Sequence, residues 1–592
     1  MAGAERSARW RAAAGRLAAG SALLTAVAFL PWLSGTDPAL TVLRARSADQ
    51  APTADQLAAV RAQLGLDQGP LPHLVHWLGG LPRGDAGTSW VSGAPVLPQV
   101  VNALGVSVTL MLATLVVTIA VAALISARTL YLGSRRRLRD HGSGTAAASL
   151  AALPKFLLAS LLATVFGVWL GWFPPGGWTG PASMVLPALA LGVPSGAVIG
   201  GLLDHALPAT FGEPWVRTWQ AAGYPPGRLV RPALRRALAG VLPQLVPSVV
   251  SLVGGAVAVE KVFNIPGLGR LALDAALAQD LPPLQTATLL LALLGIAAGL
   301  LVKALRGLLI GPALRDGGLA APPPPALGRR RSTGWVLGGC AVVLLTVGVA
   351  GLLRDPSQVD TAARLLPPSA AHPLGTDALG RDMLARLGHG ALRTAGVALA
   401  VTAASTVIGV LLGMAGPAGE GLTEVLSTLP AVLAGLLTTA VTGPSAWGAA
   451  CAVCLVGWTP YAAQTAALLE QERATGYLHA SISFGAGPVH LLRHHLLPAV
   501  LPAVVRNAVL RLPTTILVLA SLGFLGLGDP PPTPEWGRLL AENQPYLELA
   551  PWTTLGPACA LVLLSVLAAA GSPAHWTARR QARFPAGVRR AT

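Results

Sequence analysis

The sequence predicts an all-α membrane protein with about twelve transmembrane helices in two six-helix halves. Three observations predict this fold class: a composition suited to lipid, apolar segments of spanning length, and a one-sided distribution of arginines. Of the 592 residues, 53% are hydrophobic and only 11% are charged, and the mean hydropathy is +0.60. A soluble domain has roughly 25% charged residues. The chain is therefore expected to be a multi-pass protein of the cell (plasma or inner) membrane.

Apolar segments of spanning length recur along the whole chain. A transmembrane helix needs about 20 mostly apolar residues. In the N-terminal part such segments lie near 17–33, 103–127, 148–172, 183–203, 241–262 and 285–310. In the C-terminal part they lie near 334–353, 389–416, 424–442, 446–469, 498–521 and 551–571. The first is preceded by arginines like a signal peptide, but no small-residue cleavage site follows it, and we interpret it as an uncleaved spanning helix.

The arginines indicate which way the bundle lies in the membrane. With a cytoplasmic N-terminus, about 27 lysines and arginines fall in inner segments and about 10 in outer ones, as the positive-inside rule requires. Both termini are therefore expected in the cytoplasm. In a soluble protein the net charge of +17 would suggest nucleic-acid binding. Here the inner leaflet of the lipid bilayer accounts for it, and no nucleic-acid partner is expected.

A proline-rich segment divides the chain into two similar halves. Residues 314–334, "LRDGGLAAPPPPALGRRRSTG", contain four consecutive prolines and are expected to form an extended, semi-rigid cytoplasmic linker between residues 1–313 and 335–592. Each half has one apolar helix, a long outer loop and five further helices. Each also has a basic inner segment between its fourth and fifth helices, and this recurrence indicates a duplicated architecture.

The two basic inner segments follow one plan. Residues 204–240 and 470–497 each contain a short helix, a glycine that ends it, a second amphipathic stretch and a proline where the chain enters the membrane. The glycines, Gly223 and Gly485, lie 262 residues apart (485 minus 223). Glycine ends helices readily because it adopts the left-handed conformation without strain. A single copy would be read as a connecting surface helix, whereas two equivalent copies favour docking to a partner protein.

These segments resemble the EAA loops of ATP-binding cassette (ABC) importer permeases, whose motif is E-A-A-x-x-x-G followed by H-I-L-P. Both segments lack the glutamate of that motif. The resemblance implies a cytoplasmic coupling helix in each half and separate cytoplasmic ABC ATPase subunits as partners. The matching residues are Arg217, Thr218, Trp219 and Gly223 in the first segment, and His479, Ala480, Ser481, Gly485, His495 and Pro498 in the second.

Longer stretches resemble the dipeptide/oligopeptide/nickel permease family, whose importers pair a B-type and a C-type subunit. "VEKVFNIPGLGRL" (259–271) is similar to the B-type, whereas "HPLGTDALGRDMLARLGHGALRT" (372–394) and "SLGFLGLGDPPPTPEWGRLLAENQPYL" (521–547) are similar to the C-type. The resemblance implies that both subunits are fused in one chain. It also implies an extracellular solute-binding protein as a partner, with peptides as the first expected solute and nickel or another small solute as the alternative.

Charged residues near the outer ends of the second half are candidates for a site. The resemblance implies a gate that faces the solute-binding protein, but the spacing of these residues is also typical of a local ion-pair cluster, and both interpretations stay open. The residues are Asp377, Gly380, Arg381, Asp382 and Arg386.

Glu260, at the end of the fifth helix, matches an acidic position of the family. It is expected either to face the translocation pathway or to pair with Lys261, because an ionisable residue at membrane depth is a functional candidate. An ion-coupled secondary transporter is the alternative from another class. Such proteins carry ionisable residues in mid-helix, and the centres of the predicted helices are almost free of charge.

The sequence excludes ATP hydrolysis by this chain. A phosphate-binding P-loop needs a Gly-Lys-Ser/Thr sequence, and glycine precedes none of the three lysines, Lys155, Lys261 and Lys303. The protein is therefore expected to be a transporter component rather than an enzyme. No cofactor and no metal site are expected. The pair His73 and His76 has a spacing that can share a metal, but a solvated amphipathic turn is favoured.

Overall fold

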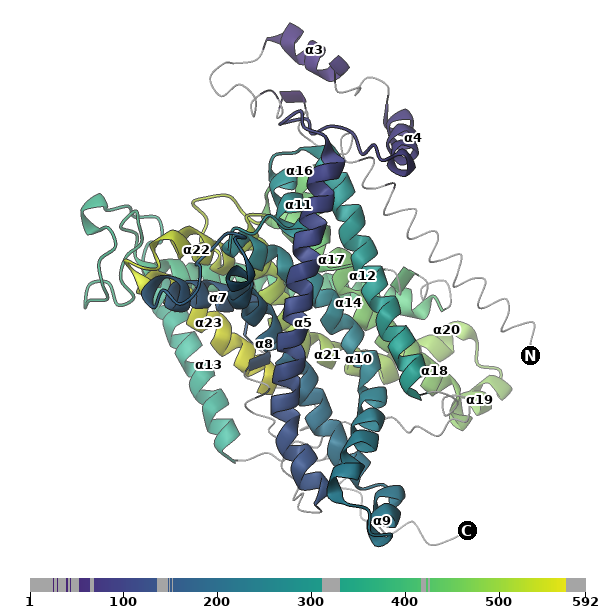
Figure 1. Ribbon diagram of the computed structural model, residues 1–592. Coiled ribbons are helices and arrows are strands. Elements are labelled where there is room, and N and C mark those ends of the chain that lie inside the picture. Colours follow the sequence, from purple (N-terminus) through teal and green to yellow (C-terminus); the bar gives the residue numbers. More distant parts are fainter. Residues whose placement is uncertain are drawn as a thin grey trace.

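The structure is a computed structural model that describes residues 53–63, 69–135, 153–310, 331–416 and 429–570, together with a few single positions. Within these ranges the elements are helices, and extended pairing is limited to two isolated bridges, Thr88 with Pro95 and Thr376 with Asp382. Figure 1 shows long helices gathered into one bundle. Helices α3 (Ala54–Gln63) and α4 (Pro70–Gly80) lie apart from it at the top.

Besides α3, α4 and the 3-10 helix Leu81–Arg83, the described part of the first half contains five long helical segments and two short helices. The long segments are α5 (Val96–Ser134), α7 (Lys155–Leu162) with the π-helical stretch η3 (Ala163–Trp169), α8 (Pro181–Phe211), α10 (Pro226–Val262) and α12 (Leu281–Ile310). The short helices are α9 (Pro214–Ala221), between α8 and α10, and α11 (Leu268–Leu277), between α10 and α12.

The second half begins with α13 (Arg331–Leu352) and then repeats this order. Its helices are α14 (Met383–Met414), α16 (Ala431–Thr442), α17 (Ala446–Gly457), α18 (Thr459–Arg473), α19 (Gly476–Ser483), α20 (Pro488–Leu491), the π-helical stretch η6 (Leu492–Leu496), α21 (Leu497–Leu525), α22 (Trp536–Asn543) and α23 (Pro551–Ala570). Helix α19 thus corresponds to α9, and α22 to α11.

The all-α membrane fold with about twelve helices is confirmed. Among the described residues, six segments are long and apolar enough to cross a membrane: Val96–Ser134, Pro181–Phe211, Leu281–Val302, Met383–Met414, Ala446–Arg473 and Pro488–Leu525. Shorter apolar helices cover Lys155–Trp169, Gly338–Leu352, Ala431–Thr442 and Pro551–Leu564, and α10 covers the predicted span 241–262. Most of the predicted span 17–33 and most of the linker 314–334 lie outside the described residues.

One predicted span is divided in the structure. The predicted span 446–469 consists of α17 and α18, which meet at Trp458, where Pro460 at the start of α18 supplies no backbone N–H. A proline thus sets a boundary that hydropathy alone does not show. Of the predicted span 424–442, helix α16 covers the part after Pro430, and the part before it lies largely outside the described residues.

Close packing of the same pair of helices holds each half together. In the first half Gly192, Gly196 and Gly200 of α8 face α5, and a Cβ on Gly196 would come within 2.7 Å of Val121 Cβ. In the second half the glycines belong to α14, the helix that corresponds to α5: Gly409 and Gly413 of α14 face α18. Small residues let helices in lipid approach closely enough for dispersion contacts to hold them.

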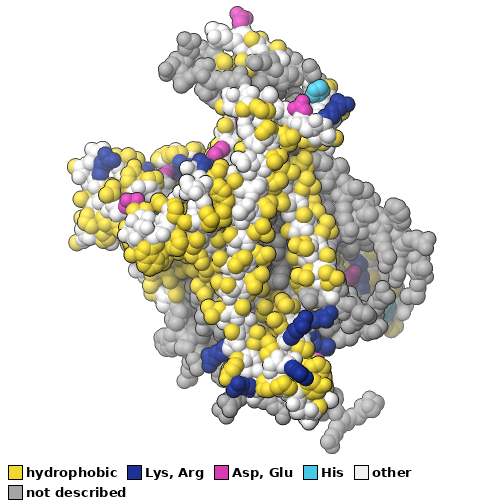
Figure 2. Space-filling view, in the orientation of Figure 1, with side chains coloured by type: hydrophobic (Ala, Val, Ile, Leu, Met, Phe, Trp, Pro, Cys, Tyr) yellow, Lys and Arg dark blue, Asp and Glu magenta, His cyan; other side chains and the backbone are white. Residues whose placement is uncertain are grey.

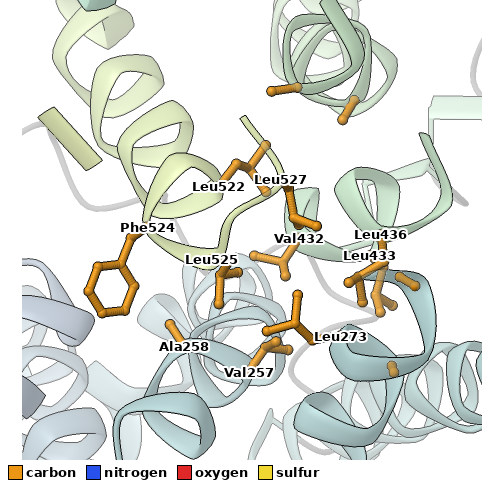
Figure 3. Packing of buried hydrophobic residues seen from close by; sticks show 14 of the residues in the cluster. Val257, Ala258, Leu273, Val432, Leu433, Leu436, Leu522, Phe524, Leu525 and Leu527 are labelled. Carbon is orange, nitrogen blue, oxygen red and sulfur yellow. The ribbon is translucent and has the colours of Figure 1, made fainter. Parts of the chain in front are cut away.

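One hydrophobic core joins the two halves at the end of the bundle that carries α11 and α22. Figure 3 shows side chains of both halves pointing toward one another: Val257, Ala258 and Leu273 from the first half and Val432, Leu433, Leu436, Leu522, Phe524, Leu525 and Leu527 from the second. We call this contact the seam. At the end that carries α9 and α19, the buried residues form separate clusters within each half, one around Val216 and Leu229 and one around Leu478 and Val504.

Candidate functional site

The paired short helices α9 and α19 end in the same backbone geometry. Gly223 and Gly485 follow them with φ angles of 78° and 86°, in the left-handed region predicted for both. After α9, Gly223 N donates to Gln220 O at 3.1 Å and Tyr224 N donates to Trp219 O at 3.1 Å. After α19, the same two bonds run from Gly485 N to Ile482 O at 2.9 Å and from Ala486 N to Ser481 O at 3.1 Å. Both ends are Schellman motifs.

Each short helix is fixed to its own half by one buried apolar side chain. Val216 of α9 packs in the cluster of the first half, and Leu478 of α19 packs in that of the second. These two positions are again 262 residues apart (478 minus 216), so the anchors and the glycines repeat in one register. Glu213 adds an ion pair to Arg236 at 2.6 Å beside α9. A force on either short helix is therefore transmitted to the helices that anchor it.

The helices that follow are continuous with the membrane segments. The basic stretch after Gly223 and the predicted fifth span form one helix of 37 residues, α10. In the second half α20, η6 and α21 likewise form one helical segment, Pro488–Leu525. The predicted separate amphipathic stretch is thus the first part of the membrane helix in both halves. Because each long helical segment is continuous into the membrane, it can act together with the short helix before it as a stiff lever.

Most sequence-predicted residues of the two loops face outward. Arg217, Thr218 and Trp219 are exposed on α9, as are His479 and Ala480 on α19, whereas Ser481 is half-buried. In the helix that follows α19, His495 is half-buried and Pro498 is exposed; the His495 ring lies 5.8 Å from the ring of Tyr477.

The most exposed large apolar side chains of this region were not singled out from the sequence. Phe484, directly before Gly485, is 91% exposed, and Ile482 is also exposed. In the first half Tyr224 follows Gly223, is exposed and stacks on Trp219. An aromatic residue next to the glycine that ends each helix was the available signal, because a large apolar side chain in water indicates a contact surface.

The predicted charged cluster of the second half forms a buried ion network. Asp377 Oδ2 accepts from Arg381 Nε at 2.7 Å and from Arg386 Nη1 at 2.6 Å. Glu542 of α22 completes the network, since its Oε2 lies 2.8 Å from Arg386 Nη2 and its Oε1 lies 2.9 Å from Arg538 Nε. Arg386 is only 1% exposed. Although burial acts in the opposite direction, the guanidinium of Arg386 holds the pKa of Glu542 below its usual range.

Asp382 and Gly380 belong to the neighbouring turn. Asp382 caps α14 by accepting from Leu384 N at 2.8 Å, and its other oxygen lies 2.5 Å from Arg354 Nη1. Gly380 has a φ of 75°, and a Cβ there would come within 1.7 Å of Asp360 O. All five predicted residues are thus brought together, in the geometry of the ion-pair interpretation.

Glu260 and Lys261 turn away from each other. Glu260 accepts from Ser107 Oγ at 2.7 Å and from Arg270 N at 2.8 Å, so its carboxylate caps the start of α11. Lys261 Nζ donates to Leu525 O at 2.8 Å, across the seam. The proposed pairing of the two side chains is not formed, because adjacent residues on a helix point in different directions.

A further carboxylate, Glu535, lies before α22 and was not predicted from the sequence. Its oxygens occupy the space left by Gly523 and Gly528, where a Cβ would come within 2.5 and 2.8 Å of them. Burial, with a contribution from the charge of Asp529, raises the pKa of Glu535 to about 7. It faces a pocket lined by Arg393, Thr394, Val397, Ala446, Ala449, Leu519, Gly528, Asp529 and Glu535.

Asp529 ties this pocket to two helices. Its Oδ2 accepts from Arg393 Nε at 2.7 Å, and its Oδ1 accepts from Ala446 N at 2.9 Å, at the start of α17. Within the described ranges no group of three or more His, Cys, Asp or Glu side chains is placed to hold a metal ion. His76 is exposed on α4, and the side chain of His73 lies outside the described residues.

Comparison with known proteins finds one family model twice, once in each half. It describes a binding-protein-dependent transport system inner membrane component and matches residues 119–311 and 396–571. A di/tripeptide transport system permease protein, DppC, of Pseudomonas aeruginosa is 37% identical over 251 residues, which are 39% of this chain and 82% of that protein. A probable D,D-dipeptide transport system permease protein, DdpC, of Escherichia coli is 34% identical over 221 residues, 36% of this chain and 74% of that protein.

Proposed function

The chain belongs to the family of binding-protein-dependent transport system inner membrane components, and from this membership we propose that it forms the translocation pathway of a peptide importer driven by separate ATPase subunits. It is a permease component of an ABC importer. The observation that carries the proposal is the repeated family match, one in each half. Two of the similar permeases are described as transporting dipeptides or tripeptides, which favours peptides over nickel or another small solute.

We assign α9 and α19 as the coupling helices that cytoplasmic ATPases grip. The two helices share one register, one buried anchor each and one Schellman motif each, and both expose apolar and aromatic residues beside the glycine. Figure 2 shows Lys and Arg side chains gathered at the lower part of the bundle, near α9. The exposed arginines there include Arg217, Arg228, Arg231, Arg235 and Arg236. This basic end would face the cytoplasm, and the α11/α22 end would face an extracellular solute-binding protein.

The mechanism follows from where the halves are joined. The seam closes the bundle at the α11/α22 end, whereas the α9/α19 ends have separate cores. With the assigned orientation this is an inward-facing arrangement. When two ATPases close on ATP, they would draw α9 and α19 together and rotate α10 and α21 as levers, which opens the seam to the solute. ATP must favour the outward-open state by a few kcal/mol for this shift to occur.

The coupling assignment is tested by substituting the two glycines. In Gly223→Val/Gly485→Val a β-branched side chain must adopt the left-handed conformation, which costs about 1–2 kcal/mol or more at each site and displaces the turn. We expect the ATPase activity that copurifies with the tagged chain from its native membranes to fall at least ~10-fold, and tripeptide uptake to fall with it.

Gly487→Ala is the matched control, because Gly487 has an ordinary φ of −72° and a Cβ there would meet nothing within 4 Å. It should copurify the ATPase as the unmodified chain does. Unchanged ATPase attachment and uptake in the double Val variant would refute the assignment of the coupling helices.

A further inference from the structure

Lys261 crosses the seam and caps a helix of the other half. Its Nζ, in the last turn of α10, donates to Leu525 O at 2.8 Å and to Phe524 O at 3.3 Å. These are the last two carbonyls of α21. The C-terminal end of a helix carries a partial negative charge, which an ammonium group stabilises. The ring of Phe524 also lies 5.9 Å from Nζ and stacks on Phe156 of the first half, with 4.9 Å between ring centroids.

This contact has no counterpart in the other direction. The ends of α10 and α21 correspond at a spacing of 262 residues, since Asn264, two residues after α10, and Gly526, directly after α21, both have positive φ, 55° and 87°. At the same spacing the position equivalent to Lys261 is Gly523. At this position of the repeat the ammonium group therefore comes from the first half alone.

The Lys261 ammonium group depends on the closed seam for its partners. The neighbouring Glu260 carboxylate accepts hydrogen bonds from Ser107 Oγ and from Arg270 N at the start of α11. Asp274 forms an ion pair with Arg270 at 3.3 Å. Within the described part of the chain no ion pair of Lys261 is formed. Opening the seam removes both carbonyls of α21 from Nζ, and the charge of Asp274, which acts on Lys261 from its own half but pairs with Arg270, compensates for this loss only in part.

We propose that Lys261 exchanges the carbonyls of α21 for a carboxylate of the solute when the seam opens. A carboxylate is a stronger acceptor for an ammonium group than a neutral carbonyl. Once the seam has opened, Nζ would face the pathway by which the solute enters. Lys261 thus closes the pathway in the absence of solute and selects solutes with a free carboxylate, such as the C-terminus of a peptide. This inference rests on the proposed function for the identity of the solute, but not for the closing contact.

The closing contact is tested by labelling. Leu525→Cys is introduced into a chain whose four native cysteines are replaced by serine, and intact cells are treated with a membrane-impermeant maleimide. Leu525 is fully buried in the seam, so labelling is expected to be slow. Adding Lys261→Met should accelerate it at least ~5-fold, because the halves lose this contact, whereas Lys261→Arg keeps donors in reach and should stay near the starting rate. Equal labelling of the Lys and Met forms would overturn the closing role.

The selection is tested by maximal uptake rates for a tripeptide with a free C-terminus and for its C-terminal amide. Saturating solute is used so that the step in the pathway, rather than capture by the solute-binding protein, is compared. The native chain should prefer the free acid at least ~10-fold, Lys261→Met should reduce the preference to within ~2-fold, and Lys261→Arg should retain it.

The outcomes separate this inference from the proposed function. An unchanged preference in Lys261→Met overturns the exchange of partners. Uptake of neither peptide by the native chain overturns the peptide assignment, and the labelling rates then decide the closing role by themselves.

Discussion

Two buried carboxylates near the seam have different surroundings. Glu260 is fully buried, but Ser107 and a backbone N–H of α11 donate to it. Glu535 occupies the corresponding region before α22, in a space made by two glycines, and its near neighbour is another carboxylate, Asp529. The two carboxylates thus share burial and differ in their hydrogen-bond donors and in the charge beside them.

Glu535 is expected to make the stability of the protein depend on pH near neutrality. Its pKa rises from the usual 4.5 to about 7 in the folded chain, so the folded state binds more protons between these values. The free energy of unfolding therefore decreases as pH rises from 4.5 through about 7. Glu535→Gln removes this dependence and should raise the melting temperature in detergent at pH 8, with little change at pH 5.

The control for this prediction is Glu548→Gln, which alters an exposed glutamate of the same loop region. It should leave the difference between pH 5 and pH 8 as it is in the native chain. A Glu535→Gln protein whose melting temperature follows pH as the native one does would show that Glu535 is ionised in the fold at neutral pH.

At single residues, the sequence predicts features that are local in the chain. The left-handed glycines 223 and 485 could be predicted because one turn determines their φ. The charges of the cluster at Asp377 could also be predicted, but not the contribution of Glu542, which lies 156 residues beyond Arg386. Lys261 shows the same limit, because its partners are backbone carbonyls of the other half and carry no sequence signal.

At the scale of elements, the glycines between α5 and α8 are expected to determine the stability of the first half. In Gly196→Val the new Cβ would come within 2.7 Å of Thr118 O and Val121 Cβ. Overpacking of this kind costs about 1–3 kcal/mol. We expect a lower melting temperature in detergent and less folded protein in the membrane.

Gly105→Ala in α5 is the comparison variant, because a Cβ there meets nothing within 4 Å. It should melt at or above the temperature of the native chain, since alanine favours a helix over glycine. If Gly196→Val melts like Gly105→Ala, the close approach of α5 and α8 does not hold the first half together.

Phe484 is expected to contribute to ATPase attachment without contributing to the fold. It is 91% exposed at the end of α19, so Phe484→Ala should leave the melting temperature of the isolated permease unchanged. Large aromatic residues at the centre of an interface commonly contribute 2 kcal/mol or more, so copurified ATPase should fall at least ~10-fold. Full ATPase recovery with Phe484→Ala would place the contact surface elsewhere on α19.

The helices themselves were largely predictable from hydropathy, and the exceptions have physical causes. Spans of about 20 apolar residues were found because the hydrocarbon core of a bilayer requires that length. The break between α17 and α18 and the π-helical stretches within Ala163–Trp169 and Leu492–Leu496 were not predicted. The break and the stretch Ala163–Trp169 preserve the apolar composition, and all three features change the backbone hydrogen-bond pattern, to which hydropathy is insensitive.

At the scale of the whole molecule, the contact between the halves was the least predictable feature. The sequence indicated the duplication, but the residues of the seam come from segments more than 150 positions apart, such as Gly254 and Pro430. Their apolar character suits lipid as well as protein, so composition does not distinguish a residue in the seam from one facing the bilayer. Only the close approaches, such as 3.0 Å from a Gly254 Cβ to Pro430 Cβ, make the distinction.

The seam is expected to hold the two halves together without the linker. If the chain is divided between Ala321 and Pro322 and the two parts are produced together, a tag on the first part should recover the second in about equal amount. The cores of Figure 3 and the contacts of Lys261 and Phe156 are formed entirely by residues outside the linker. The linker would then raise only the effective concentration of one half near the other.

Gly254→Leu in the divided protein should reduce this recovery several-fold, because its side chain would be forced against Pro430 and Val432 across the seam. Gly338→Leu, on an exposed position of α13 where a Cβ meets nothing within 4 Å, should not reduce it. If the halves separate even without Gly254→Leu, the linker and not the seam determines their association. The rocking of two independently anchored halves would then need the covalent connection, and the closed seam would be too weak to act as a gate.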